Sequence, residues 1–123
     1  MTDDAGVLRE RLELVLAMDD PGLKRLGEAQ TSVTFSNLDL PEASVTLLLD
    51  RDPPQLVPAG DPAEITIELT AEQFDLFANG ALALAPSLLT GAATFRGPIR
   101  RYLAVDPVMR RLLGAAHKVS AAS

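Results

Sequence analysis

The feature that most constrains the fold is a change in hydrophobic period at residue 70. Over residues 64–69 aliphatic residues alternate with polar ones, which predicts a strand with one buried face. Residues 70–73 then read Thr-Ala-Glu-Gln, a capping box whose first and last side chains satisfy free backbone N–H groups at a helix start. Phe74 and Phe77 follow at helical spacing, and Gly80 predicts the helix end. A strand that runs directly into a helix indicates a mixed α and β fold.

The segments before this junction predict one helical region followed by strands. Residues 5–18 place leucines and valines at helical spacing, with charged residues between them, and so predict an amphipathic helix. We expect Asp20 to cap a second, short helix. Alternating apolar residues predict strands at 33–36 and 45–49, and residues 55–57, between prolines, predict a short edge strand.

The segments after the junction predict more helix and one more strand. We expect a short helix that starts near Pro86, a strand at 92–95 between two glycines, and a helix that starts at Pro98. Asp106 is expected to cap a further helix, and the small, polar residues 114–123 are expected to fray. Grouped strands with helices at both ends predict an α+β fold with a largely antiparallel sheet and helices on one face.

Length and composition predict one domain over residues 1–123. The chain has 123 residues, of which 47% are hydrophobic and 23% charged, as in ordinary globular proteins. The absence of cysteine excludes disulfides and thiol nucleophiles, and the single histidine, His117, disfavours a zinc site. The glycines are too widely spaced for a phosphate-binding loop. We expect no catalytic residues, no bound metal and no cofactor.

The charge is unevenly distributed along the chain. The net charge is −6, but residues 1–90 carry −11 whereas residues 91–123 carry +5. This balance disfavours nucleic acid as a partner, and only the last quarter is expected to attract an anion. No apolar run reaches the roughly 18–20 residues of a membrane span, and the acidic first residues differ from a secretory signal. We expect a cytoplasmic protein with at most transient membrane-surface contact.

Residues 64–113 resemble the sterol carrier protein type 2 family. The resemblance rests on the alternating strand, the capped helix over 70–80, the stretch Ala-Pro-Ser-Leu-Leu-Thr-Gly at 85–91, and the glycine-flanked Ala-Ala-Thr-Phe-Arg-Gly at 92–97. Where family members often carry lysine and an Asp or Asn, this chain has Ala92 and Pro98. The resemblance implies a five-stranded sheet covered by helices that enclose an apolar tunnel for a fatty acyl chain, a phospholipid or a sterol-like molecule.

A tunnel of this kind is expected to be lined by apolar residues from the second half of the chain, although any one such residue more often simply fills a core. The candidates are Phe74, Phe77, Leu82, Leu88, Leu89, Phe95, Ile99, Leu103, Met109 and Leu113. Three of the four phenylalanines lie between residues 74 and 95, which favours a site there. Arg96 and Arg100 are candidates for contact with an anionic head group, or belong to a solvated basic face.

Three functions are compatible with the sequence. The first is non-enzymatic binding and transfer, or presentation, of an apolar ligand. The second is an accessory or scaffold role, in which the surface binds a lipid-pathway enzyme or a second copy of the chain as a homodimer. The third is a small enzyme that uses Tyr102, Asp75 or Asp106 as acid or base. A continuous cavity favours the first, and a packed interior with an exposed apolar patch favours the second.

Overall fold

One five-stranded sheet forms the centre of the fold. The computed structural model describes residues 7–18, 20–51, 54–60 and 63–122. The strands are β1 (Ser32–Asn37), β2 (Val45–Leu48), β3 (Gln55–Pro58), β4 (Ile65–Leu69) and β5 (Thr94–Arg96). Their order across the sheet is β3-β2-β1-β4-β5. Three of the four pairings are antiparallel, and the central pairing of β1 with β4 is parallel, so the sheet is mixed.

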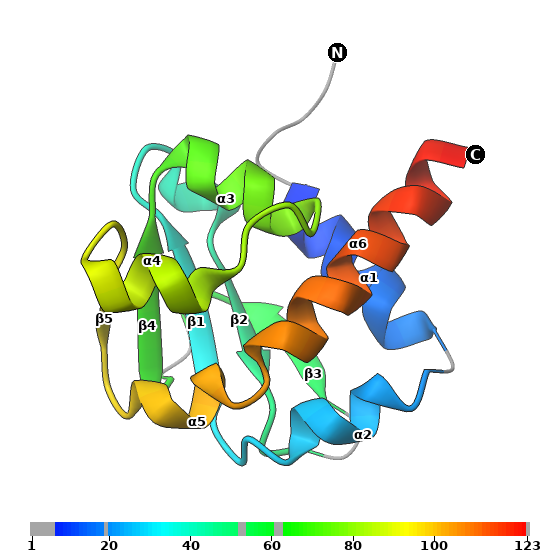
Figure 1. Ribbon diagram of the computed structural model, residues 1–123, viewed down its shortest axis with the longest axis horizontal. Coiled ribbons are helices and arrows are strands. Elements are labelled where there is room, and N and C mark those ends of the chain that lie inside the picture. Colours follow the sequence, from blue (N-terminus) through cyan, green and yellow to red (C-terminus); the bar gives the residue numbers. More distant parts are fainter. Residues whose placement is uncertain (1–6, 19, 52–53, 61–62, 123) are drawn as a thin grey trace.

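Six α-helices are found in the described part of the chain. They are α1 (Val7–Ala17), α2 (Gly22–Gly27), α3 (Ala71–Ala78), α4 (Leu84–Thr90), α5 (Ile99–Leu103) and α6 (Asp106–Ala122). Figure 1 shows the helices on one side of the sheet, with α4 passing across β4 and β1 and with α6 beside α1. A short 3₁₀ turn at Pro41–Ala43 connects β1 to β2. The predicted α+β class with helices on one face of a largely antiparallel sheet is confirmed.

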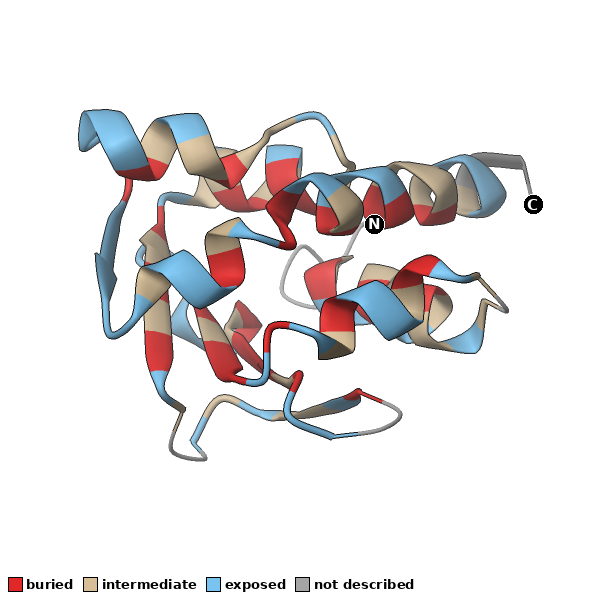
Figure 2. Cartoon of the chain, turned by 60° about the horizontal axis from the view of Figure 1, so that its bottom comes forward, coloured by how far each residue is buried: buried red, intermediate tan, exposed pale blue. Residues whose placement is uncertain are grey.

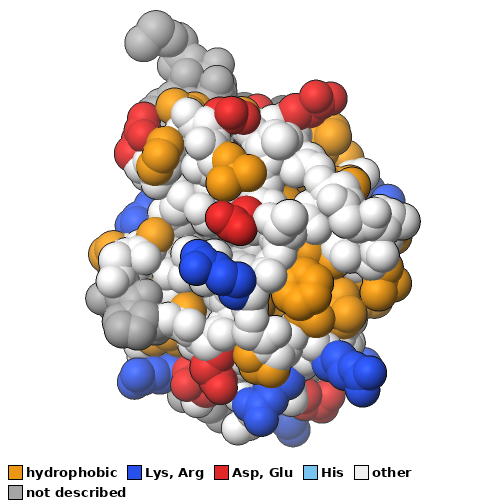
Figure 3. Space-filling model, turned by 90° about the vertical axis from the view of Figure 1, so that its left-hand side faces the viewer, with side chains coloured by type: hydrophobic (Ala, Val, Ile, Leu, Met, Phe, Trp, Pro, Cys, Tyr) orange, Lys and Arg blue, Asp and Glu red, His pale blue; other side chains and the backbone are white. Residues whose placement is uncertain are grey.

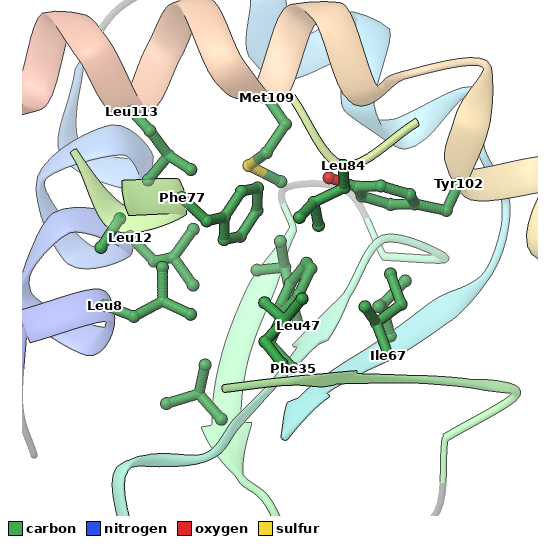
Figure 4. Packing of buried hydrophobic residues seen from close by; sticks show 14 of the residues in the cluster. Leu8, Leu12, Phe35, Leu47, Ile67, Phe77, Leu84, Tyr102, Met109 and Leu113 are labelled. Carbon is green, nitrogen blue, oxygen red and sulfur yellow. The ribbon is translucent and has the colours of Figure 1, made fainter. Parts of the chain in front are cut away.

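The hydrophobic core lies between the sheet and the helices. Alternate residues of β1 and β4, including Phe35 and Ile67, point to the helices and are fully buried. Figure 4 shows Met109 and Leu113 of α6 reaching down towards Phe77 of α3, with Phe35 below them. The Phe35 ring lies 5.0 Å from the Phe77 ring, centroid to centroid. Large side chains from both layers therefore fill the space between sheet and helices.

The capping box predicted at Thr70 is present and also connects distant parts of the chain. The Gln73 N–H donates to the Thr70 hydroxyl at 3.2 Å, and the Thr70 N–H donates to the Gln73 side-chain oxygen at 2.9 Å. The Gln73 side-chain amide also donates to the Ala92 carbonyl at 2.9 Å. The start of α3 is thereby tied to the loop that leads into β5, which fixes where the last strand joins the sheet.

Two predicted segments differ in the structure. Helix α4 begins at Leu84 rather than near Pro86, because Leu84 is fully buried and a proline is tolerated in the first turn of a helix. Helix α6 continues to Ala122, so the prediction of fraying from residue 114 was wrong. Ala116 is fully buried and α6 packs against α1, and this packing stabilises the helix beyond Gly114.

The last strand is also shifted, to Thr94–Arg96 from the predicted 92–95, because Arg96 pairs with Thr66 of β4. Residues 5 and 6 of the predicted first helix lie outside the described residues, and the rest of that helix is confirmed as α1, which ends one residue earlier than predicted, at Ala17. The edge strand expected at 55–57 is β3, at one edge of the sheet. Within the described part of the chain, no helix is both long enough and apolar enough to cross a lipid bilayer.

We expect Gly97→Ala to destabilise the fold. Gly97 has φ +98°, a conformation that side chains disfavour, and a Cβ atom there would overlap the backbone carbonyl of Glu64. The free energy of unfolding should fall by at least about 1 kcal/mol in urea denaturation followed by circular dichroism. Gly27→Ala is the matched control, since no atom lies within 4 Å of its Cβ position. Equal stability of the two variants would contradict the assigned backbone constraint.

Candidate functional site

The layer between sheet and helices is open at β5. Phe95 pairs with Ile67 of β4, and residues directly opposite each other in an antiparallel pair point to the same face. Phe95 therefore lies on the core face, yet its side chain is 39% exposed, whereas Ile67 is fully buried. Figure 2 shows β5 exposed along its whole length at the edge of the sheet. An aromatic side chain on the core face thus remains accessible to solvent.

Apolar residues of α4 and α5 flank this opening. Leu88 and Leu89 lie on the last turns of α4, where Leu88 is buried and Leu89 is 77% exposed. The N–H of Ala93 donates to the carbonyl of Ser87 at 3.0 Å and so holds the loop before β5 against α4. Beyond the C-terminal end of β5, Ile99 and Leu103 of α5 are half-buried against the core. We call Leu88, Leu89, Phe95, Ile99 and Leu103 the β5 rim.

The side of the molecule on which β5 lies carries exposed apolar side chains, among them Leu89 and Phe95. Figure 3 views this side and shows hydrophobic side chains gathered to the right of its centre, with charged side chains around them. A contiguous exposed apolar patch is a feature of ligand-binding and protein-binding sites in soluble proteins. Five of the ten residues predicted to line a tunnel thus lie on β5 and on the two helices that precede and follow it in the chain.

The other five predicted residues lie in the core. Phe74, Phe77, Met109 and Leu113 are fully buried, and Leu82 is partly buried against the same cluster. Two pockets, of about 240 and 590 Å³, lie at the surface, and none of the ten predicted residues lines either of them. Within the described residues, the apolar tunnel implied by the family resemblance is not shown, and buried side chains of the sheet and the helices pack together between the two layers.

The two arginines predicted to contact a head group do not converge on the β5 rim. Arg96 pairs with Thr66, and the neighbouring residue Phe95 pairs with Ile67. Because adjacent residues of a strand point to opposite faces, the Arg96 side chain projects from the face opposite to that of Phe95. Arg100 is exposed on α5. Neither guanidinium forms an ion pair with any residue that the structure describes. Both side chains are therefore available to solvent, but only Arg100 shares a helix with rim residues.

A buried pair, Tyr102 and Asp106, was not identified as a unit from the sequence. The Tyr102 hydroxyl donates to Asp106 Oδ1 at 2.7 Å, and the backbone N–H of Ala85 donates to Oδ2 at 3.0 Å. Both side chains are almost completely buried. Asp106 is the first residue of α6, but its carboxylate binds α5 and α4 instead of capping its own helix as predicted. The spacing of four residues within a helical region was the signal that could have revealed the pair.

The Tyr102–Asp106 pair has the geometry of a structural connection. Burial raises the pKa of the Tyr102 hydroxyl well above its usual value of 10.0, and the charge of Asp106 raises it further. Tyr102 is therefore a neutral hydrogen-bond donor at physiological pH. A general base must reach a substrate proton, whereas both oxygens of Asp106 already accept hydrogen bonds inside the core. Groups of three or more metal-ligating side chains are not found among the described residues.

Comparison with solved structures identifies the fold. No protein-family model matches the chain, and no curated protein is significantly similar to it in sequence. In structure, the chain matches the sterol carrier protein domain 2 of Helicoverpa armigera with a TM-score of 0.66 and 14% identity, over 93% of each chain. A crystal structure of sterol carrier protein 2 matches with a TM-score of 0.62 and 14% identity, over 92% of this chain and 95% of that one. The chain has the sterol carrier protein 2 fold.

A further neighbour with the sterol carrier protein 2 fold is described as the ubiquinone synthesis protein UbiJ-SCP2. It matches with a TM-score of 0.59 and 13% identity, over 85% of this chain and 87% of that one. The low identities mean that these matches establish the arrangement of helices and strands. The five-stranded sheet implied by the sequence resemblance is therefore confirmed, and the β5 rim is a property of this chain's own residues.

We expect Tyr102 to resist titration in the folded protein. Because its pKa is raised in the folded state, the folded protein holds the proton more tightly, and stability should fall as pH rises above about 10. Tyr102 is the only tyrosine and the chain has no tryptophan, so tyrosinate absorbance reports this residue alone. Alkaline titration should show tyrosinate only as the protein unfolds.

Tyr102→Phe is the matched variant for this titration. It should be less stable at neutral pH by about 1–3 kcal/mol, because the buried carboxylate loses one donor. The extra loss of stability above pH 10 that is due to Tyr102 should be absent in the variant. Ordinary titration of Tyr102 in protein that remains folded by circular dichroism would show that the hydroxyl is not held as described.

Proposed function

We propose that this protein binds an apolar ligand with a long hydrocarbon portion, such as a fatty acyl chain, a phospholipid or a sterol-like molecule, without catalysing a reaction. The observation that carries the proposal is Phe95, an aromatic residue on the core face of an uncovered edge strand. The shared fold with sterol carrier proteins supports the same conclusion. The ligand's hydrocarbon portion contacts the β5 rim, and the remaining predicted residues lie behind it in the core.

The energetics favour a ligand of this kind. Covering about 400 Å² of apolar ligand surface contributes on the order of 10 kcal/mol before the costs of association are subtracted. Leu89 and Phe95 lose unfavourable contact with water in the same step. Strand β5 has three residues, lies at the edge of the sheet and is held by few backbone pairings. Local opening at β5 therefore has a lower free-energy cost than opening elsewhere in the sheet. Entry of a hydrocarbon chain between α4 and β5 is thus less costly than entry elsewhere.

A second candidate function is binding of a protein partner through the β5 rim. The observation in its favour is the combination of a packed interior with an exposed apolar patch, which is expected of an accessory protein. The neighbour described as a ubiquinone synthesis protein shows that this fold also occurs in a biosynthetic context. The partner in that case is a lipid-pathway enzyme or a second copy of the chain.

The first test is native mass spectrometry of the purified protein, followed by titration with a fluorescent fatty acid. A co-purifying lipid near one per protein, together with saturable binding of the probe, is the result expected for a lipid-binding protein. Phe95→Ser should weaken binding of the probe by at least about tenfold, because a Phe side chain contributes about 1.5–3 kcal/mol when it is buried by the ligand. Leu89→Ser should weaken it in the same direction.

Val119→Ser is the matched control, since Val119 is 55% exposed on α6, at the other side of the molecule from β5 (Figure 1). It should bind the probe like the unmodified protein. A lipid-free protein that binds no fatty acid would refute the proposal. In that case the self-association of the protein should be measured as a function of concentration. Self-association would identify the β5 rim as a protein interface if Leu89→Ser abolishes it and Val119→Ser retains it.

A further inference from the structure

A groove of about 590 Å³ lies on the outer face of α6, next to the end of α3. Its lining residues share one helical face of α6 and the turn after α3: Asn79, Gly80, Pro107, Arg110, Arg111, Gly114, Ala115, His117 and Lys118. Figure 1 shows the end of α3 beside the middle of α6, while β5 lies at the opposite side of the molecule. The groove is therefore separate from the β5 rim.

The groove carries positive charge in a chain whose net charge is −6. Arg110, Arg111 and Lys118 line it together with His117, and none of its described lining residues is acidic. One end of the groove adjoins the first turn of α6 at Pro107, where the helix dipole is positive. Positive charge and a helix start favour an anionic ligand over a neutral one.

Two of the guanidinium groups are held in place before any ligand binds. Arg110 Nε donates to the Gly80 carbonyl at 3.2 Å, which fixes the side chain against the end of α3. Arg111 donates through both terminal nitrogens to the carboxylate of Asp20, at 3.3 and 3.1 Å. Each guanidinium has five N–H donors, so both arginines keep donors for a ligand. Groups that are already oriented lose less entropy when they bind.

The floor of the groove is made of small residues. Gly80 has φ +74°, and a Cβ atom there would overlap the backbone nitrogen of Gly114, so α3 and α6 meet backbone to backbone. Gly114, by contrast, has no atom within 4 Å of its own Cβ position. The open space above Gly114, between the long basic side chains, is the volume in which a compact ligand fits.

The histidine of the groove supplies a further donor. His117 Nδ1 lies 3.3 Å from Arg11 Nη2, and a guanidinium can only donate. In this contact Nδ1 is the acceptor, so the ring N–H that remains as a donor is at Nε2. Arg11 Nε is buried without a hydrogen-bond partner in the structure. Arg11 thus adds a positive charge beside His117, and it forms no ion pair with a described carboxylate.

We propose that the α6 groove, lined by Arg110, Arg111, His117 and Lys118 over a floor at Gly114, binds a phosphate-bearing anion. The guanidinium fork matches phosphate oxygens, and several donors around one small space suit a group with many acceptors better than a single carboxylate. The proposal does not depend on lipid binding at the β5 rim, because the two sites share no residue.

The test is a titration of the isotope-labelled protein with sodium pyrophosphate, followed by amide NMR shifts. Saturable shifts should be confined to the groove, including the amides of Gly80, Gly114 and Ala115. The double variant Arg110→Gln with Lys118→Gln should bind at least about tenfold more weakly, the loss expected when a charge-assisted hydrogen bond is removed. The double variant Arg96→Gln with Arg100→Gln removes the same charge elsewhere and should bind normally.

Gly114→Leu distinguishes a site that depends on the shape of the groove from general electrostatic attraction of anions. The substitution fills the space above the floor of the groove and leaves every charged side chain in place. It should weaken binding of pyrophosphate by at least the same factor, with folding verified by circular dichroism and Gly114→Ala as a smaller second variant. Three results would overturn the proposal. They are normal binding of pyrophosphate by both Gly114 variants, equal binding by the two double variants, and NMR shifts that do not saturate.

A second arm distinguishes the source of the phosphate. Sedimentation with phosphatidylcholine vesicles that contain phosphatidic acid is compared with sedimentation with phosphatidylcholine alone. If the protein binds the vesicles that contain phosphatidic acid and Gly114→Leu does not, the site is assigned to a lipid head group. Binding of pyrophosphate without binding to either vesicle assigns it to a soluble phosphate compound.

Discussion

The ring of Phe35 is the point on which the arrangement of the helices depends. It lies on the central strand β1, 5.0 Å from the ring of Phe77 on α3 and 5.8 Å from the ring of Tyr102 on α5. Tyr102 then donates to Asp106 of α6, and Asp106 accepts from the backbone of Ala85 in α4. One series of contacts therefore joins the sheet to four helices. Its polar part is buried and each of its groups has a partner, which is the condition under which buried polar groups do not destabilise a core.

Local sequence rules predicted the elements whose signals do not depend on distant residues. The capping box at Thr70 and the alternation from Ile65 to Leu69 were sufficient for β4 and α3, because both depend on short-range hydrogen bonding and on one buried face. The end of α6 was not predictable in this way. Its small residues suit a frayed tail and a tightly packed helix equally well, and only the burial of Ala116 in the packed structure distinguishes the two.

The candidate site was predictable in composition but not in location. Leu88 and Leu89 are adjacent and chemically identical, yet one is buried and the other is 77% exposed, because successive residues of a helix point about 100° apart. Apolar patterning likewise cannot separate Phe77, which fills the core, from Phe95, which lies at its open edge. The exposure of Phe95 follows from β5 being the last strand of the sheet, and that position follows from pairings between segments far apart in the sequence. The role of Asp106 was hidden for the same reason, since its partner Ala85 lies on another helix.

The distribution of charge separates the two surface features by chemistry as well as by position. At the β5 rim Arg96, the neighbour of Phe95, points from the opposite face of the sheet, so the core face at Phe95 is apolar. The α6 groove has the opposite character, since its arginines are oriented by Gly80 and Asp20 and its floor offers little apolar contact. A ligand that gains its affinity from burial and one that gains it from charge-assisted hydrogen bonds need different surfaces. Because the two surfaces lie on different sides of the molecule, a single small amphipathic molecule cannot satisfy both. An anion in the groove would therefore act on ligand binding at the rim only through the contacts that α6 makes with Tyr102 and the core.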